Sequence, residues 1–155
     1  MSEPTVGLGP VPRKRSRQPA IQLSDEALAQ EILYRKMFPK GLKFQAHGMT
    51  PDDVNAVLAA FTTFCEHAVQ IKYQGTHGPL ELREAQRETL RDIVENRRVI
   101  ILKARQIGFS TLISVFALWC AMAGHDRQIY FLSRGQREAR SLLSKARYAY
   151  RKMPD

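Results

Sequence analysis

The chain has few cysteines, no cluster of histidines and no apolar run long enough to cross a bilayer. Its 155 residues include 2 cysteines and 4 histidines, and Cys65 and Cys120 stand far apart in apolar surroundings. This pattern favours buried free thiols in a reducing compartment, and it gives little support to a metal site made of protein ligands alone. The apolar run at residues 112–123 is shorter than the about 20 residues of a membrane span. No apolar leader core is visible at the N-terminus. We therefore expect a cytosolic protein with no membrane segment.

Acidic residues are also scarce relative to basic ones. The chain has 24 Lys and Arg against 15 Asp and Glu, for a net charge of +9. Such an excess favours an anionic partner such as nucleic acid. Part of it lies in the segment 12–17, which is either a solubilising arm or a set of phosphate contacts. An apolar content of 44% is sufficient for a folded core.

The chain is expected to consist of three parts, of which the first is marked by four prolines and a basic cluster. Residues 1–22 are expected to form a flexible basic arm, residues 23–78 a helical N-terminal segment, and residues 79–155 a further domain. Helices are predicted at residues 24–38, 83–96 and 136–152, where apolar residues gather on one face, and at residues 110–123, where the run is almost continuously apolar. Another helix is predicted to begin at Thr50, because threonine followed by Pro51 and two aspartates is a typical helix start. Residues 74–79 are predicted to form a turn.

The segment from Lys103 to Thr111 resembles a phosphate-binding loop whose lysine has moved. In the usual P-loop, G-x-x-x-x-G-K-[ST], backbone N–H groups and a lysine bind phosphates and the hydroxyl holds Mg²⁺. Gly108 stands at the second glycine position, Ser110 at the hydroxyl position and Phe109 where the lysine is expected. Lys103, at the first glycine position, can still reach the same phosphates. The alternative is a basic turn between a buried strand and a buried helix.

Apolar segments on both sides of this loop predict the fold. Residues 99–102 and 128–132 are expected to be strands, and with the helix between them they make a parallel βαβ unit with a right-handed crossover. The predicted fold is α/β. Residues 79–155 are expected to be an incomplete P-loop ATPase domain of the RecA-like kind, preceded by the helical segment and the disordered basic arm.

Gln86 precedes the loop at the start of a predicted helix. A glutamine amide donates and accepts hydrogen bonds at the same time, so in this position it can recognise an adenine edge. The alternative is an ordinary solvated glutamine on a helix surface.

Several short motifs together resemble the large subunit of phage terminases, the ATP-driven motors that package DNA. The resemblance runs from about residue 60 to the end of the chain. It rests on four features: Phe64-Cys65 with Ile71-Lys72 and Gly75; Leu82-Arg83-x-x-Gln86; Lys103-x-Arg105-Gln106-x-Gly108-x-Ser110; and the segment 133–139.

The resemblance implies a site for ATP and Mg²⁺. Gln86 would read the adenine, Lys103 and Arg105 would be the catalytic cations on the phosphates, and Ser110 would hold the metal. The remaining cofactor-binding positions would be those of the loop: Lys103, Ala104, Arg105, Gln106, Ile107, Gly108, Phe109, Ser110 and Thr111. It also implies double-stranded DNA, the terminase small subunit and the portal protein as partners, homo-oligomers in the full-length motor, and a place in the cytoplasm of the bacterial host.

Two features of such motors are missing from the sequence. No apolar strand ends in the acidic residues that bind Mg²⁺ and polarise the attacking water, and no nuclease domain with clustered carboxylates follows. We therefore expect an N-terminal fragment that binds ATP but does not turn it over, whereas the full-length family member is an ATPase and a nuclease. Two alternatives stay open: a non-enzymatic basic DNA-binding module, and a fragment of a helicase-like translocase.

Overall fold

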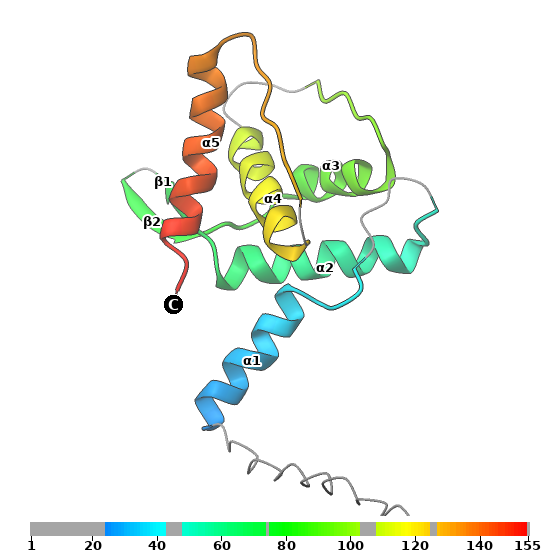
Figure 1. Ribbon diagram of the computed structural model, residues 1–155, viewed down its shortest axis with the longest axis vertical. Coiled ribbons are helices and arrows are strands. Elements are labelled where there is room, and N and C mark those ends of the chain that lie inside the picture. Colours follow the sequence, from blue (N-terminus) through cyan, green and yellow to red (C-terminus); the bar gives the residue numbers. More distant parts are fainter. Residues whose placement is uncertain (1–23, 43–47, 74, 103–107, 125–126, 155) are drawn as a thin grey trace, which may run out of the picture.

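Helices make up most of the described chain, and α2 lies at their centre (Figure 1). The computed structural model describes residues 24–42, 48–73, 75–102, 108–124 and 127–154. Within these ranges the chain forms five helices and one antiparallel hairpin, in the order α1 (Asp25–Met37), α2 (Pro51–His67), β1 (Gln70–Tyr73), β2 (Thr76–Pro79), α3 (Glu84–Glu95), α4 (Phe109–Ala123) and α5 (Gln136–Arg151). Helix α2 packs against α1, α3 and α4, and α5 packs on α4. The predicted arm, residues 1–22, lies outside the described residues.

The start of α2 is fixed by its own sequence, as predicted. The Thr50 hydroxyl accepts the backbone N–H of Asp53 at 3.2 Å, and the Asp53 carboxylate accepts the N–H of Thr50 at 3.0 Å. Pro51 occupies the first turn, where its missing N–H leaves no hydrogen bond unmade. This reciprocal capping box satisfies backbone groups that the helix itself cannot pair. The apolar face that follows is fully buried at Val57, Phe61 and Phe64.

An aromatic cluster joins α2 to α4 and fixes the position of α4. The Phe61 ring lies 5.0 Å from that of Phe116, edge to face, and 5.5 Å from that of Trp119. The Trp119 indole N–H donates to the carbonyl of Met37 at 2.9 Å, which ties the end of α1 to the same cluster. Near the start of α4, Phe109 and Leu112 are buried in the core. The first turn of α4 is therefore held rigidly by packing.

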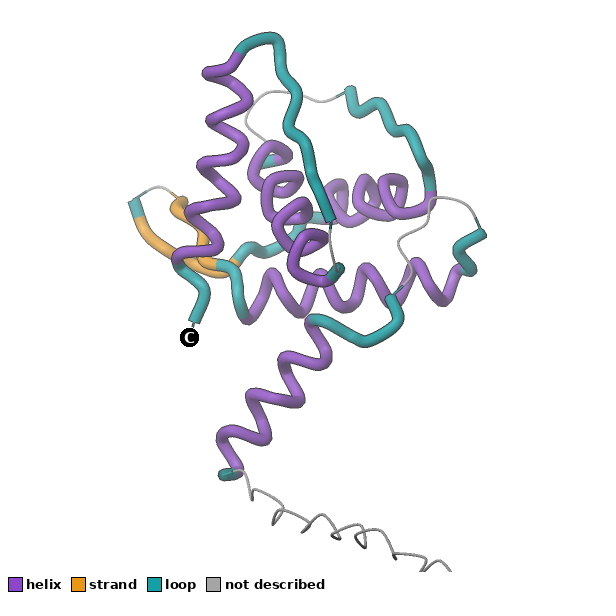
Figure 2. The backbone as a smooth tube through the Cα atoms, viewed as in Figure 1, coloured by secondary structure: helices purple, strands orange, loops and turns teal. Residues whose placement is uncertain are grey.

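The predicted parallel βαβ unit is wrong. Residues 99–102 and 127–133 run as extended segments without strand pairing, drawn as loops in Figure 2. Ile100 and Leu102 are almost fully exposed, and so is most of Leu132. Among the described residues, the sheet contains two strands, β1 and β2, which pair with each other. An apolar run becomes a buried strand only when neighbouring strands supply hydrogen bonds and cover, and these segments have neither. The described fold is mostly helical, not α/β.

The turn predicted at residues 74–79 is part of a β-hairpin. Strands β1 and β2 are antiparallel, with Ile71 opposite Gly78 and Lys72 opposite His77. Gly75 in the connection has a φ of 88°, in the left-handed region that glycine adopts most easily. Helix α5 supports the hairpin, because the Tyr148 hydroxyl lies 2.5 Å from Nδ1 of His77 and the two rings stack.

Candidate functional site

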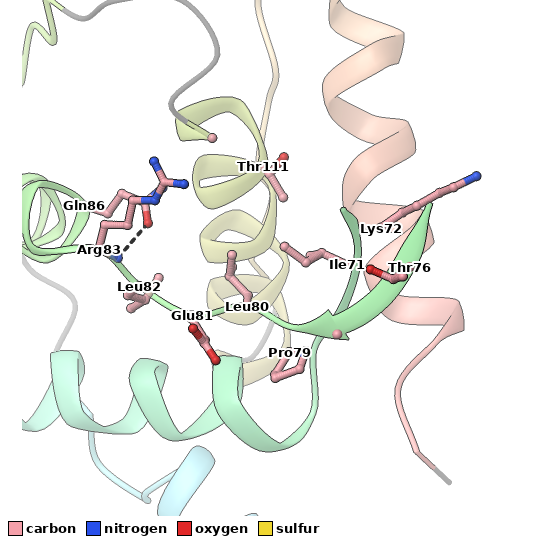
Figure 3. Close-up of a pocket in the computed structure, with 12 residues that line it drawn as sticks. Ile71, Lys72, Thr76, Pro79, Leu80, Glu81, Leu82, Arg83, Gln86 and Thr111 are labelled. Carbon is pink, nitrogen blue, oxygen red and sulfur yellow. Dashed lines mark hydrogen bonds between the residues drawn. The ribbon is translucent and has the colours of Figure 1, made fainter. Parts of the chain in front are cut away.

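A pocket of about 500 Å³ opens between the hairpin and the first turns of α3 and α4 (Figure 3). One side is the hairpin, with Ile71, Lys72, Thr76, Gly78 and Pro79. The floor is the connecting segment 80–83, and the remaining wall combines Gln86 with Gly108 and Thr111. This volume lies within the range of sites that bind small molecules and cofactors. The wall therefore brings together the two segments that the sequence analysis selected, around Gln86 and around Gly108.

Gln86 is buried, and in addition to lining the pocket it caps the start of α3. Its side chain is 5% exposed, although glutamine is usually solvated. Its Oε1 accepts the backbone N–H of Arg83 at 3.0 Å, which caps the start of α3. This bond fixes the rotamer and the orientation of the amide. The interpretation of Gln86 as a solvated surface residue is therefore excluded.

Gly108 brings α4 into contact with Gln86. It is the N-cap residue of α4 and has a φ of 77°. A Cβ atom at this position would lie 3.1 Å from Nε2 of Gln86, closer than an ordinary van der Waals contact. Glycine is needed at position 108 both for the left-handed backbone and for this close approach.

The first turn of α4 lies beside the pocket, which Gly108 and Thr111 line. The N–H groups of Thr111 and Leu112 each donate to the carbonyl of Gly108 at 3.0 Å. Those of Phe109 and Ser110 precede the first intrahelical bond, and α4 has no side-chain cap. A helix N-terminus of this kind carries a partial positive charge and suits an anion such as phosphate.

The predicted site residues fall into three groups. Gln86, Gly108 and Thr111 line the pocket. Phe109 does not contribute its side chain, because the ring is buried in the hydrophobic core and anchors the helix. Ser110 is exposed at the first turn and its carbonyl accepts the Ser114 hydroxyl at 2.7 Å. The predicted positions Lys103, Ala104, Arg105, Gln106 and Ile107 lie outside the described residues.

Sequence reasoning missed the hairpin as a wall of the site. Lys72 and Arg83 add cations to the lining, and Glu81 is its one carboxylate among the described residues. Figure 3 shows Arg83 beside Gln86 at one end of the pocket and Lys72 extending from the hairpin at the other. The signal that predicts this hairpin is Gln74-Gly75 between Ile71-Lys72-Tyr73 and Thr76, because a two-residue connection containing glycine is typical of tight hairpins.

The described residues contain no group of three His, Cys, Asp or Glu side chains that would bind a metal by themselves. A metal that enters together with phosphates needs fewer protein ligands, because the phosphate oxygens supply the rest. Ser110 does not line the pocket, although its neighbour Thr111 does, so its role as a Mg²⁺ ligand stays a prediction. Hard oxygen donors of this type are the ones that Mg²⁺ prefers.

Comparison with known proteins identifies no relative of the chain. No family model, curated protein or solved structure matches the chain. Within the ranges that the structure describes, none of the helices is long and apolar enough to cross a membrane.

Proposed function

We propose that the pocket binds ATP, with the adenine at Gln86 and the phosphates at the first turn of α4. The proposal is carried by one observation: Gln86 and Gly108, which the sequence analysis assigned to one nucleotide site, lie in contact in the wall of a single pocket. The volume of about 500 Å³ suits a nucleotide. Ile71, Leu80 and Leu82 provide the apolar surface against which a base can pack.

The fixed amide of Gln86 supports adenine as the base. Because Oε1 accepts the Arg83 N–H, the orientation of the amide is set before any ligand binds. A carboxamide oxygen has a second lone pair, which can accept the adenine N6–H while Nε2 donates to N7. Guanine presents an acceptor where adenine has the N6 amino group. It would bind well only if the amide turned over and released its bond to Arg83.

The first turn of α4 supports the assignment of the phosphates. The partial positive charge of this helix N-terminus, which has no side-chain cap, favours an anion. In the proposal, Lys103 and Arg105 add positive charge to the same phosphates. The Ser110 hydroxyl would complete the coordination of a Mg²⁺ ion carried in with them, and that ion would neutralise phosphate charge.

We further propose, from the resemblance to terminase large subunits, that ATP binding serves the packaging of viral DNA. Double-stranded DNA, the terminase small subunit and the portal protein would then be the partners, with further copies of the chain in the assembled motor. The place of action would be the cytoplasm of a bacterial host. This biological setting is proposed from the sequence motifs.

The Gln86→Glu variant tests the nucleotide site most sharply. A carboxylate keeps the oxygen that caps α3, so the variant should fold, but it loses the amide donor and adds a negative charge. We expect the wild-type chain to bind ATP with Mg²⁺ in isothermal titration calorimetry, more tightly than GTP. The affinity for ATP should fall by about tenfold or more in the variant, because a hydrogen bond is lost and a charge faces the ligand.

Gln30→Glu is the matched control, because Gln30 is exposed on α1 and the change in charge is the same. It should bind ATP as the wild type does. Equal affinities of Gln86→Glu and wild type would overturn the role of Gln86. An absence of ATP binding in the wild type would favour the alternative of a non-enzymatic DNA-binding module.

A further inference from the structure

The positive charge of the chain is concentrated near its C-terminal end. Residues 127–154 contain eight Lys and Arg and one acid, Glu138, which gives a net charge of +7 out of the +9 of the whole chain. Residues 24–124 contain 12 basic and 11 acidic residues and are almost neutral. The basic character is therefore a local property of α5 and the segment before it, in addition to the N-terminal arm.

Four arginines of α5 form a line on one side of the helix. Arg137, Arg140, Arg147 and Arg151 follow one another at helical spacing, and all four are exposed. We call these four residues the arginine stripe. At a rise of about 1.5 Å per residue, the stripe is about 21 Å long. It lies on the side of α5 opposite Ala146 and Ala149, which are buried.

The charges of the stripe are not neutralised within the described part of the chain. No ion pair there involves any of the four arginines. Glu138, the one acid on α5, lies 3.6 Å from Arg134, which precedes the helix. Four uncompensated guanidinium groups on a rigid helix make a surface for a polyanion, since each presents a planar set of donors that matches phosphate oxygens.

We propose that the arginine stripe binds the phosphate backbone of a nucleic-acid duplex without reading its sequence. A duplex is a stiff, evenly charged rod, and a straight row of arginines about 21 Å long can contact several of its phosphates at once. This surface is separate from the nucleotide pocket and does not depend on the proposed ATP binding.

Two other polyanions fit the surface less well. Single strands are bound mainly through several aromatic rings on which successive bases stack. Of the two tyrosines of α5, Tyr148 is hydrogen-bonded to His77 and Tyr150 alone is exposed, beside four exposed arginines. An anionic membrane attracts amphipathic helices that insert an apolar face. The buried face of α5 packs against α4 and is not available for insertion.

The test compares two variants with the same loss of charge. The stripe variant carries Arg137→Gln, Arg140→Gln, Arg147→Gln and Arg151→Gln, and the control carries Arg35→Gln, Lys36→Gln, Lys40→Gln and Arg91→Gln on other exposed surfaces. Binding of a fluorescein-labelled DNA duplex is followed by anisotropy at several salt concentrations, without ATP, after circular dichroism has shown that both variants are folded.

We expect the slope of log K against log salt concentration to become shallower by up to about 3.6 in the stripe variant, because each phosphate contact contributes about 0.9. The control should keep most of the wild-type slope. Equal changes of slope in both variants, or an unchanged slope in the stripe variant, would overturn the proposal. So would tighter binding to the single strand than to the duplex, or binding to phosphatidylserine vesicles but not to DNA. Each of these failures would leave ATP binding at the pocket untouched.

Discussion

A Cβ atom on Gly108 would lie 3.1 Å from Nε2 of Gln86, so the starts of α4 and α3 meet more closely than an ordinary van der Waals contact would allow for a side chain at position 108. Gln86 cannot move away freely, because its Oε1 caps α3 through the Arg83 N–H. The pocket lies where these two helix starts meet. Any change that separates Gln86 from Gly108 should alter both stability and ligand binding.

The first prediction concerns Gly108→Ala. The φ of 77° would cost about 1–2 kcal/mol for alanine, and the new methyl group would also displace Gln86 from its capping bond at a further cost of roughly 1 kcal/mol. Gly41→Ala is the control, because Gly41 has a φ of 80° but no heavy atom within 4 Å of the added Cβ. In urea unfolding followed by circular dichroism, Gly108→Ala should be the less stable of the two. Equal losses would show that the contact with Gln86 contributes nothing.

The second prediction concerns Lys103→Ala. If this lysine binds the phosphates from the start of the loop, its loss should weaken ATP binding by about 1.5–3 kcal/mol, the range of hydrogen bonds to charged groups. That corresponds to tenfold or more in the dissociation constant. Arg98→Ala removes a charge from the exposed segment just before the loop and should have a much smaller effect. Similar affinities of the two variants in calorimetry would contradict the role of Lys103.

The third prediction concerns stability at alkaline pH. Burial raises the pKa of the Cys65 thiol well above its ordinary value near 9.0, and neighbouring Glu66 raises it further. Burial also raises the pKa of Cys120, to about 12, although Arg127 lowers it in part. The folded chain therefore holds these protons more tightly than the unfolded chain does. Their contribution to stability is complete below about pH 9 and is lost as the pH rises toward 12.

The measurement is the free energy of unfolding between pH 8 and pH 11. Each of the two thiols should lower the free energy of unfolding by up to about 1.4 kcal/mol per pH unit above pH 9. The Cys65→Ala, Cys120→Ala double variant should lose stability less steeply, because the two thiols with raised pKa are gone. Parallel curves for the double variant and the wild type would contradict the burial of the thiols.

Local signals in the sequence predicted the helices well. Thr50 is the N-cap of α2 and Pro51 its first residue, as the sequence predicted. These features depend on residues a few positions apart, so a sequence contains most of the information about them. The segment predicted as a turn, residues 74–79, contains the connection and the second strand of a hairpin. The strands were not predicted, because they are short and carry few apolar residues.

Features that depend on distant residues were predicted poorly. The apolar run at residues 99–102 has the composition of a buried strand, but its partners would have to come from elsewhere in the chain, and Ile100 remains exposed. The meeting of Gln86 with Gly108 is also non-local. The resemblance to a family placed both residues in one nucleotide site, but no spacing rule predicted the contact between them. The hairpin wall with Lys72 was not expected at all.

Hydrogen–deuterium exchange in the presence and absence of ATP and Mg²⁺ tests the location of the nucleotide site most directly. At saturating ATP, the account predicts slower exchange at residues 76–86 and 108–112, which surround the pocket, with no change in α1. The Gln86→Glu variant at the same ATP concentration should show weaker protection of both segments. Unchanged exchange at these segments, or protection confined to other helices, would contradict a nucleotide site at this pocket.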